Sequence, residues 1–131
     1  MMPETIHALL EHARMMQQRA FAPYSNFKVG ACVQTSCGKL FGGCNIESAS
    51  YGLTICAERV AIFNAIAQGY NSFTHLALVT TTGAYPCGAC RQIIYEFCPN
   101  ASIIIATASS INYATSKELL PHAFNNEKLG R

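Results

Sequence analysis

The chain has 131 residues, a length typical of one domain, and we expect residues 1–131 to form a single domain around a hydrophobic core. Charged residues make up only 12% of the chain, about half the share of an average soluble domain, so we expect part of the surface to be buried in a homo-oligomer. The formal net charge is +2 and no run of basic residues occurs, which argues against a nucleic acid as the substrate.

The first half of the chain predicts a helix followed by a hairpin. Residues 3–20 carry one apolar stripe with Pro3 in the first turn, and this pattern predicts a helix. Pro23 and the pair Ser25-Asn26 end it in a turn. The segments that follow predict strands over 27–35 and 40–46, which a turn at 36–39 joins.

The second half alternates helices and strands. A polar loop over 47–54 precedes a predicted helix, and Gly69 is suited to cap its end. The predicted helices cover 55–69 and 87–98, the predicted strands cover 72–81, 102–108 and 111–115, and 117–131 forms a helical turn and a tail. This order predicts an α/β domain, a mixed sheet with helices on both faces. The strands that follow crossover helices are expected to run parallel to a neighbour.

Seven cysteines occur: Cys32, Cys37, Cys44, Cys56, Cys87, Cys90 and Cys98. The N-terminal residues include charged and histidine side chains where a signal peptide needs an apolar core, and no apolar run is long enough to cross a bilayer. We therefore expect a cytoplasmic protein that does not associate with membranes. In that reducing compartment, cysteine pairs are considered as metal ligands before disulfides. Three of the cysteines, Cys32, Cys44 and Cys98, fall on apolar faces and are expected in the core.

Three cysteines and one glutamate form a pattern that favours a catalytic zinc site. Cys87 and Cys90 lie three residues apart at the start of one predicted helix, and Cys56 precedes Glu58 by two residues at the start of another. Catalytic zinc keeps three protein ligands and leaves the fourth position to water, whereas structural zinc is closed by four. A carboxylate beside such a water can transfer protons. A structural zinc knot or metal-free core thiols are the alternatives.

The arrangement Cys56-x-Glu58 followed by Pro86-Cys87-x-x-Cys90 resembles the signature of the zinc deaminases. Beyond it, the segments FAPYSNFKVGA, GCNIESASYGLTICAERVAIFNAI, PCGACRQIIYEF and ELLPHAF are similar to segments of the small cytidine deaminases and span nearly the whole chain. The resemblance implies a three-layer α/β/α fold with a mixed five-stranded sheet, and a homotetramer with pockets shared between subunits. It implies one Zn²⁺ per chain and the hydrolytic deamination of cytidine or deoxycytidine in pyrimidine salvage.

The resemblance also assigns roles in the chemical step. Cys56, Cys87 and Cys90 bind zinc, and Glu58 carries protons from the attacking water to the ring and to the leaving ammonia. Three thiolates on Zn²⁺ leave the site with a net charge of about −1, and a cation close by offsets such a charge. We expect Arg59 to do this, with an ordinary surface charge as the alternative. Arg91 is a weaker candidate for the same role.

The substrate residues that the resemblance implies lie outside the zinc motif. Phe27 packs against the pyrimidine, Asn45 and Glu47 bind the ribose hydroxyls, the backbone at Ala57 holds the amide edge of the base, and Phe124 closes the pocket from a neighbouring subunit. Without the resemblance, Asn45 and Glu47 are as readily explained as turn caps.

Three positions depart from the family pattern. His122 replaces a usual glycine, the loop 80–85 is short and lacks an acidic residue, and Cys37 replaces a polar residue in the hairpin turn. The first two are expected to border the pocket and to affect which substrate is preferred.

Two alternative functions remain open at this point. One is a deaminase of a related substrate, such as blasticidin S or a cytidine nucleotide, although no cluster of cations for a phosphate occurs. The other is a catalytically silent zinc-binding module, which would have no need of Glu58.

Overall fold

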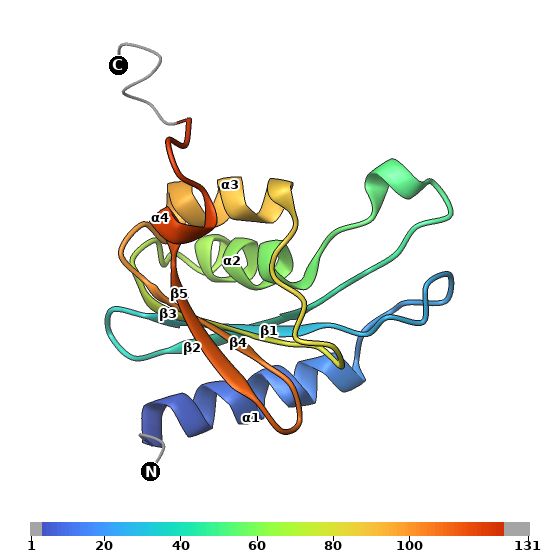
Figure 1. Ribbon diagram of the computed structural model, residues 1–131, viewed down its shortest axis with the longest axis horizontal. Coiled ribbons are helices and arrows are strands. Elements are labelled where there is room, and N and C mark those ends of the chain that lie inside the picture. The colour runs from blue at the N-terminus through green and yellow to red at the C-terminus, as the bar shows by residue number, and fades with distance from the viewer. Residues whose placement is uncertain (1–3, 125–131) are drawn as a thin grey trace.

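The structure, a computed structural model, describes residues 4–124. Figure 1 shows a central sheet with one long helix on one face and the other helices on the opposite face. The helices are α1 (Glu4–Gln18), α2 (Ala57–Ala67), α3 (Gly88–Phe97) and α4 (Ser116–Leu119), with a 3₁₀-helix η1 (Tyr51–Leu53). The strands are β1 (Gly30–Thr35), β2 (Leu40–Cys44), β3 (Phe73–Val79), β4 (Ser102–Ala106) and β5 (Ile111–Thr115). The expected three-layer α/β/α fold with a mixed five-stranded sheet is confirmed.

The strands follow one another across the sheet in the order β2-β1-β3-β4-β5. The predicted hairpin is present as the antiparallel pair β1–β2, and β4 pairs in parallel with β3. The crossover helix α2 connects β2 to β3, and these two strands run in the same direction with β1 between them. β3 therefore pairs with β1 in the antiparallel direction. Its parallel neighbour is the later strand β4.

The register brings three connecting segments to one edge of the sheet. Gly30, the first residue of β1, pairs with Cys44, the last residue of β2, and with Val79, the last residue of β3. The segments 19–29, 45–56 and 80–87 therefore all leave the sheet at the same edge. The first two extend beyond it as two arms (Figure 1), the second of which contains η1.

Apolar side chains fill both faces of the sheet. Alternate residues of a strand point to opposite faces, so Leu76 and Leu78 of β3 pack in the cluster beneath α2 and α3, whereas Ala77 and Val79 pack beneath α1. Cys32, Cys44 and Cys98 are buried, as expected.

Two glycines allow the helices to approach the sheet closely. A Cβ atom at Gly30 would lie 1.9 Å from the carbonyl oxygen of Ala13 in α1, and one at Gly43 would lie 2.3 Å from the backbone nitrogen of Ala61 in α2. Any side chain at Gly43 would therefore push away α2, the helix that carries Glu58.

Several element boundaries differ from the predicted ones. β1 begins at Gly30 rather than at residue 27, because the Asn45 side chain occupies the backbone groups of the preceding residues: its Oδ1 accepts from Val29 N–H at 2.9 Å and its Nδ2 donates to the Phe27 carbonyl at 2.8 Å.

The predicted helix start at Pro3 and the tail over 125–131 lie outside the described residues. Within the part of the chain that the structure describes, no helix has the length and apolar character that crossing a membrane requires.

Candidate active site

Three cysteine sulfurs meet at the edge of the sheet where the connecting segments leave it. The Sγ atoms of Cys56 and Cys87 lie 3.8 Å apart, those of Cys87 and Cys90 lie 3.3 Å apart, and all three lie within 4.8 Å of one another. Tetrahedral zinc with Zn–S bonds of about 2.3 Å places its sulfur ligands about 3.8 Å apart. The three predicted ligands are therefore close enough to hold one such ion, and among residues 4–124 they form the one cluster of this kind.

The starts of two helices position these sulfurs. Cys56 and Cys87 are the N-cap residues of α2 and α3, and both have extended backbone angles. A helix N-terminus carries a partial positive charge, which favours a thiolate at Cys56. Hydrogen bonds to the Cys90 thiol and to the Arg59 guanidinium outweigh the effect of burial and lower the pKa of Cys56 to about 5. The same hydrogen bond to Cys56, together with burial, raises the pKa of the Cys90 thiol. Negative charge in the cluster is therefore favoured at Cys56.

Glu58 lies next to the cluster in the first turn of α2. Only 4% of its surface is exposed, and burial raises the pKa of its carboxyl group above the ordinary glutamate value. A raised pKa suits a group that must both accept and release a proton near neutral pH. The structure thus places at the cysteine cluster a carboxyl group with the protonation behaviour of a proton carrier.

Arg59 contacts the cluster directly. Its Nη2 donates to the Cys56 sulfur at 3.7 Å. Its Nε is buried and has no hydrogen-bond partner. Among the described residues, no other buried side-chain nitrogen or oxygen lacks a partner. A guanidinium held at this position is suited to offset the negative charge of three thiolates.

Arg59→Ala is expected to lower turnover by about 10–100-fold while leaving the fold intact, which is the usual effect of removing a group that supports a metal ligand. The measurements are turnover and zinc affinity, with circular dichroism as the check of folding. Arg59→Lys keeps the charge and should retain more of both properties. Wild-type turnover and zinc affinity in both variants would mean that Arg59 is only a surface charge.

Arg91 hydrogen-bonds to backbone carbonyls near the cluster. Its Nε donates to the Pro86 carbonyl at 2.7 Å and its Nη1 donates to the Leu119 carbonyl at 2.9 Å. It therefore ties the loop before Cys87 to the end of α4, whereas Arg59 is the arginine bonded to a cluster sulfur.

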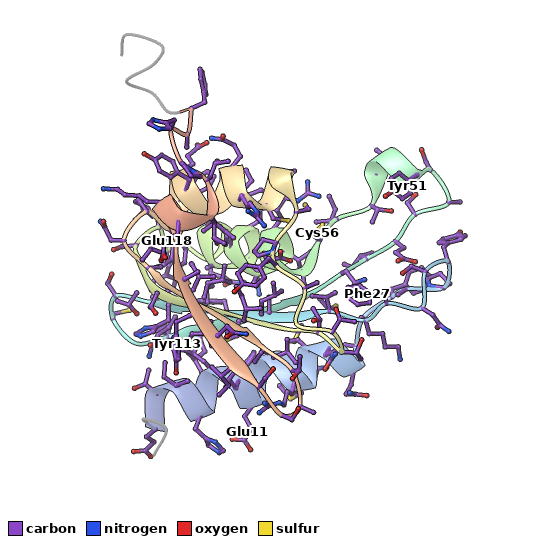
Figure 2. All side chains as sticks on the ribbon, viewed as in Figure 1. Glu11, Phe27, Tyr51, Cys56, Tyr113 and Glu118 are labelled. Atoms are coloured by element: carbon purple, nitrogen blue, oxygen red, sulfur yellow. The ribbon has the colours of Figure 1, made fainter. Side chains whose placement is uncertain are left out.

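A pocket of about 310 Å³ opens beside the cluster. Most of the predicted site residues line it: Phe27, Asn45, Glu47, Cys56, Ala57, Glu58 and Cys87. Figure 2 shows Phe27, Tyr51 and Cys56 on the same side of the molecule. The size falls at the lower end of the range for small-molecule sites. Among residues 4–124, no lysine, arginine or histidine lines the pocket, so this part of the chain offers no cationic side chain to a phosphate group there.

Both predicted ribose-binding side chains already form hydrogen bonds to the backbone of the segment that borders the pocket. Asn45 is buried and bonds the backbone on either side of residue 28, as described above. The Glu47 carboxylate accepts from the backbone N–H groups of Tyr24 and Ser25 and from the Ser25 hydroxyl. An amide and a carboxylate have more hydrogen-bonding positions than these contacts use, so both can still bind a ligand.

Two predicted pocket residues lie elsewhere in the single chain. Phe124 does not line the pocket, its side chain is 54% exposed, and its carbonyl accepts from Gln92 Nε2 of α3 at 2.8 Å. His122 likewise does not line the pocket. Its φ of 54° lies in the left-handed region that glycine adopts without strain, which explains why glycine suits this position. By contrast, the short loop 80–85 does border the pocket, through Thr80, Ala84 and Tyr85.

Sequence reasoning missed several residues that line the pocket: Ser25, Val29, Tyr51, Thr54, Ile55 and Leu78. Most of them belong to the connecting segments, and no spacing rule identifies them. The sheet register could have indicated them, because it brings those segments together.

An α/β/α fold that places a cluster of three cysteine sulfurs and a buried glutamate beside a small pocket defines a class of protein: metal-dependent enzymes that activate water. Residues 3–107 match the family model of the cytidine and deoxycytidylate deaminase zinc-binding region. The chain therefore belongs to this zinc-binding deaminase family.

Individual relatives agree with the family match. The chain is 41% identical to a cytidine deaminase from Sporosarcina psychrophila over 128 residues, which cover 95% of this chain and 94% of the relative. It is 40% identical to a probable cytidine deaminase from Dictyostelium discoideum, with 96% and 88% covered. A crystal structure of cytidine deaminase from Burkholderia pseudomallei is 45% identical and superposes with a TM-score of 0.88, covering 94% of this chain and all of that chain.

Proposed function

We propose that this chain is a zinc-dependent cytidine deaminase, which converts cytidine or deoxycytidine and water into uridine or deoxyuridine and ammonia. The observation that carries the proposal is one pocket that combines a three-cysteine cluster, the buried Glu58 and side chains able to bind a base and a sugar. The absence of cationic side chains from the pocket lining, as far as the described part of the chain supplies it, favours a nucleoside over a nucleotide.

The chemical step depends on Cys56, Cys87, Cys90 and Glu58. The three cysteines would hold one zinc ion per chain, which when bound supplies the Lewis acidity that makes water nucleophilic at neutral pH. Glu58 takes a proton from the attacking water and delivers it to the ring nitrogen as the C4–O bond forms. The same carboxylate then takes the remaining proton from the hydroxyl group added at C4 and gives it to the amino group, so that the C4–N bond breaks, the C4 carbonyl forms and ammonia leaves as a neutral molecule.

The remaining residues hold the nucleoside. The Phe27 ring would pack on the pyrimidine, and the backbone at Ala57, in the first turn of α2, would bind the amide edge of the base. Asn45 and Glu47 would bind the sugar hydroxyls through the positions that their existing hydrogen bonds leave free.

We also propose that the chain is a single domain over 1–131, that it acts in the cytoplasm and that it forms a homotetramer. All seven cysteines are free, in keeping with a reducing compartment. The two arms expose large apolar side chains that a second subunit could cover: Phe21, Tyr24, Ile46, Tyr51 and Leu53. Phe124, which is exposed and away from its own pocket, would close the pocket of a neighbour.

Phe124→Ala is expected to lower kcat/KM for cytidine by about 10–100-fold, because burial of a phenylalanine against the substrate is worth roughly 1.5–3 kcal/mol. Zinc content should not change. Analytical ultracentrifugation should find the wild type and the variant as tetramers.

Subunit mixing tests whether Phe124 acts between chains. Glu58→Gln chains supply an intact Phe124 but no proton carrier, and Phe124→Ala chains supply the reverse. Oligomers that contain both chains should exceed the summed activity of the two separate variants. No gain on co-expression, or an active wild-type monomer, would contradict the shared pocket.

A substrate screen tests the proposed function. Zinc-loaded protein should deaminate cytidine or deoxycytidine and should act poorly on cytidine monophosphate and blasticidin S. Faster turnover of blasticidin S would make the chain a deaminase of that antibiotic. Failure with every compound at full zinc occupancy would favour the silent zinc-binding module.

A further inference from the structure

Ser25 lines the pocket and connects two groups that the proposed function assigns to the substrate. Its hydroxyl oxygen accepts from the Phe27 backbone N–H at 3.0 Å, and its hydroxyl proton is donated to Glu47 Oε2. Asn26, between the two residues, has a φ of 61°, a left-handed conformation that asparagine tolerates better than most residues. The turn therefore brings the Ser25 hydroxyl back toward Phe27 and fixes the direction of its proton.

The Glu47 carboxylate is held on both of its oxygens by this turn. Oε1 accepts from Tyr24 N–H at 3.0 Å and from Ser25 N–H at 3.1 Å, while Oε2 accepts from the Ser25 hydroxyl. The Ser25 hydroxyl is also the main reason why the pKa of Glu47 lies below its ordinary value. Glu47 is therefore an oriented anion at neutral pH, with a free acceptor position on Oε2, whereas the two N–H groups occupy both positions of Oε1.

The Ser25 hydroxyl is not required to hold the two arms together. The backbones of the arms are already joined, because Phe21 N–H donates to the Asn45 carbonyl at 3.0 Å and Glu47 N–H donates to the Phe21 carbonyl at 2.8 Å. What the hydroxyl adds is a third hydrogen bond to the carboxylate, which fixes the orientation of Oε2. The loss of this hydroxyl should change the geometry of Glu47 and leave the fold as it is.

We propose that Ser25 is a further positioning residue, which orients the Glu47 carboxylate toward the sugar hydroxyls and thereby sets the preference for a hydroxylated sugar. This inference rests on the proposed function, in which Glu47 binds the sugar. Ser25 acts on substrate binding through Glu47 and takes no part in the proton transfers at Glu58.

The test compares Ser25→Ala and Ser25→Thr with wild type on cytidine and on 2′,3′-dideoxycytidine, which lacks the 2′ and 3′ hydroxyls of the sugar. Ser25→Ala should raise KM for cytidine by about 3–10-fold, the usual effect of losing one hydrogen bond. Its kcat should stay close to the wild-type value. KM for dideoxycytidine should change little, because that substrate offers Glu47 no 2′ or 3′ hydroxyl to bind. Ser25→Thr keeps the hydroxyl and should restore KM for cytidine.

Ser48→Ala is the matched control. Ser48 lies on the other arm, its hydroxyl accepts from Ser50 N–H at 3.1 Å, and it does not line the pocket of about 310 Å³. Its kinetics should equal those of the wild type. Zinc content and melting temperature, measured on each sample, should not differ among the variants.

The possible outcomes separate this inference from the proposed function. If Ser25→Ala raises KM equally for both substrates, or for neither, Ser25 does not act through Glu47 and the inference is wrong while the deaminase assignment stands. If Ser25→Thr fails to restore KM, the hydroxyl is not the group responsible, and the inference is again wrong. A wild-type protein that deaminates neither nucleoside overturns the proposed function together with the inference.

Discussion

Glu58→Gln is expected to keep its zinc, its oligomeric state and its affinity for cytidine, yet to form uridine at least 10²–10⁴-fold more slowly, the usual loss when one general acid–base group is removed. Glutamine can still form hydrogen bonds, but it cannot carry a proton. The reaction needs one carboxyl group for several proton transfers, so the loss should reach or exceed the upper end of this range. The burial of Glu58 leaves little water to replace it as the proton carrier.

The measurement is the rate of uridine formation at saturating cytidine, beside the zinc content of the same sample. Glu58→Asp is a useful companion, because it keeps a carboxyl group but shortens its reach, and its rate should fall between those of wild type and Glu58→Gln. If the Glu58→Gln rate matches that of wild type at equal zinc content, Glu58 is not the proton carrier.

Cys87→Ala is expected to lose most of its zinc and to melt at a lower temperature, because Cys56 and Cys90 alone cannot complete the site. Metal analysis after dialysis against a weak chelator measures the loss, and thermal unfolding with and without added zinc measures the stability. Added zinc should raise the melting temperature of the wild type and have little effect on the variant.

Cys37→Ala provides the matched control for that experiment. Cys37 is exposed in the hairpin turn, where its sulfur lies 3.2 Å from the Thr35 hydroxyl. This variant should retain full zinc. If Cys87→Ala also retains full zinc, the assignment of Cys87 as a ligand is wrong.

The sequence predicts the helices and strands because each leaves a periodic apolar pattern that survives in the fold. Leu9, Leu10 and Ala13 mark the buried face of α1, and the isoleucines of β4 mark a strand that is buried on both faces. The start of β1 could not be predicted, because the Asn45 side chain, sixteen residues from Val29, decides where the strand begins.

Spacing identifies the cysteine cluster because Cys87 and Cys90 lie three residues apart at one helix start, and Cys56 lies two residues before Glu58 at another. The residues that line the rest of the pocket have no characteristic spacing in the sequence. Tyr51, Thr80 and Tyr85 reach the pocket from two different segments, and only the register of β1 with β2 and β3 brings those segments together. The contacts of Arg91 are likewise not predictable from its place next to Cys90 in the sequence, because its side chain bonds the carbonyls of Pro86 and Leu119.

A zinc titration of metal-free protein tests the zinc-dependent deaminase assignment most directly. Chelator-treated wild type should form no uridine from cytidine, and the rate should rise in proportion to added Zn²⁺ until each chain holds one ion in its three-cysteine cluster. Uridine and ammonia should appear in equal amounts. Full zinc occupancy without uridine formation would contradict the assignment, and so would deamination that continues at the same rate in zinc-free protein.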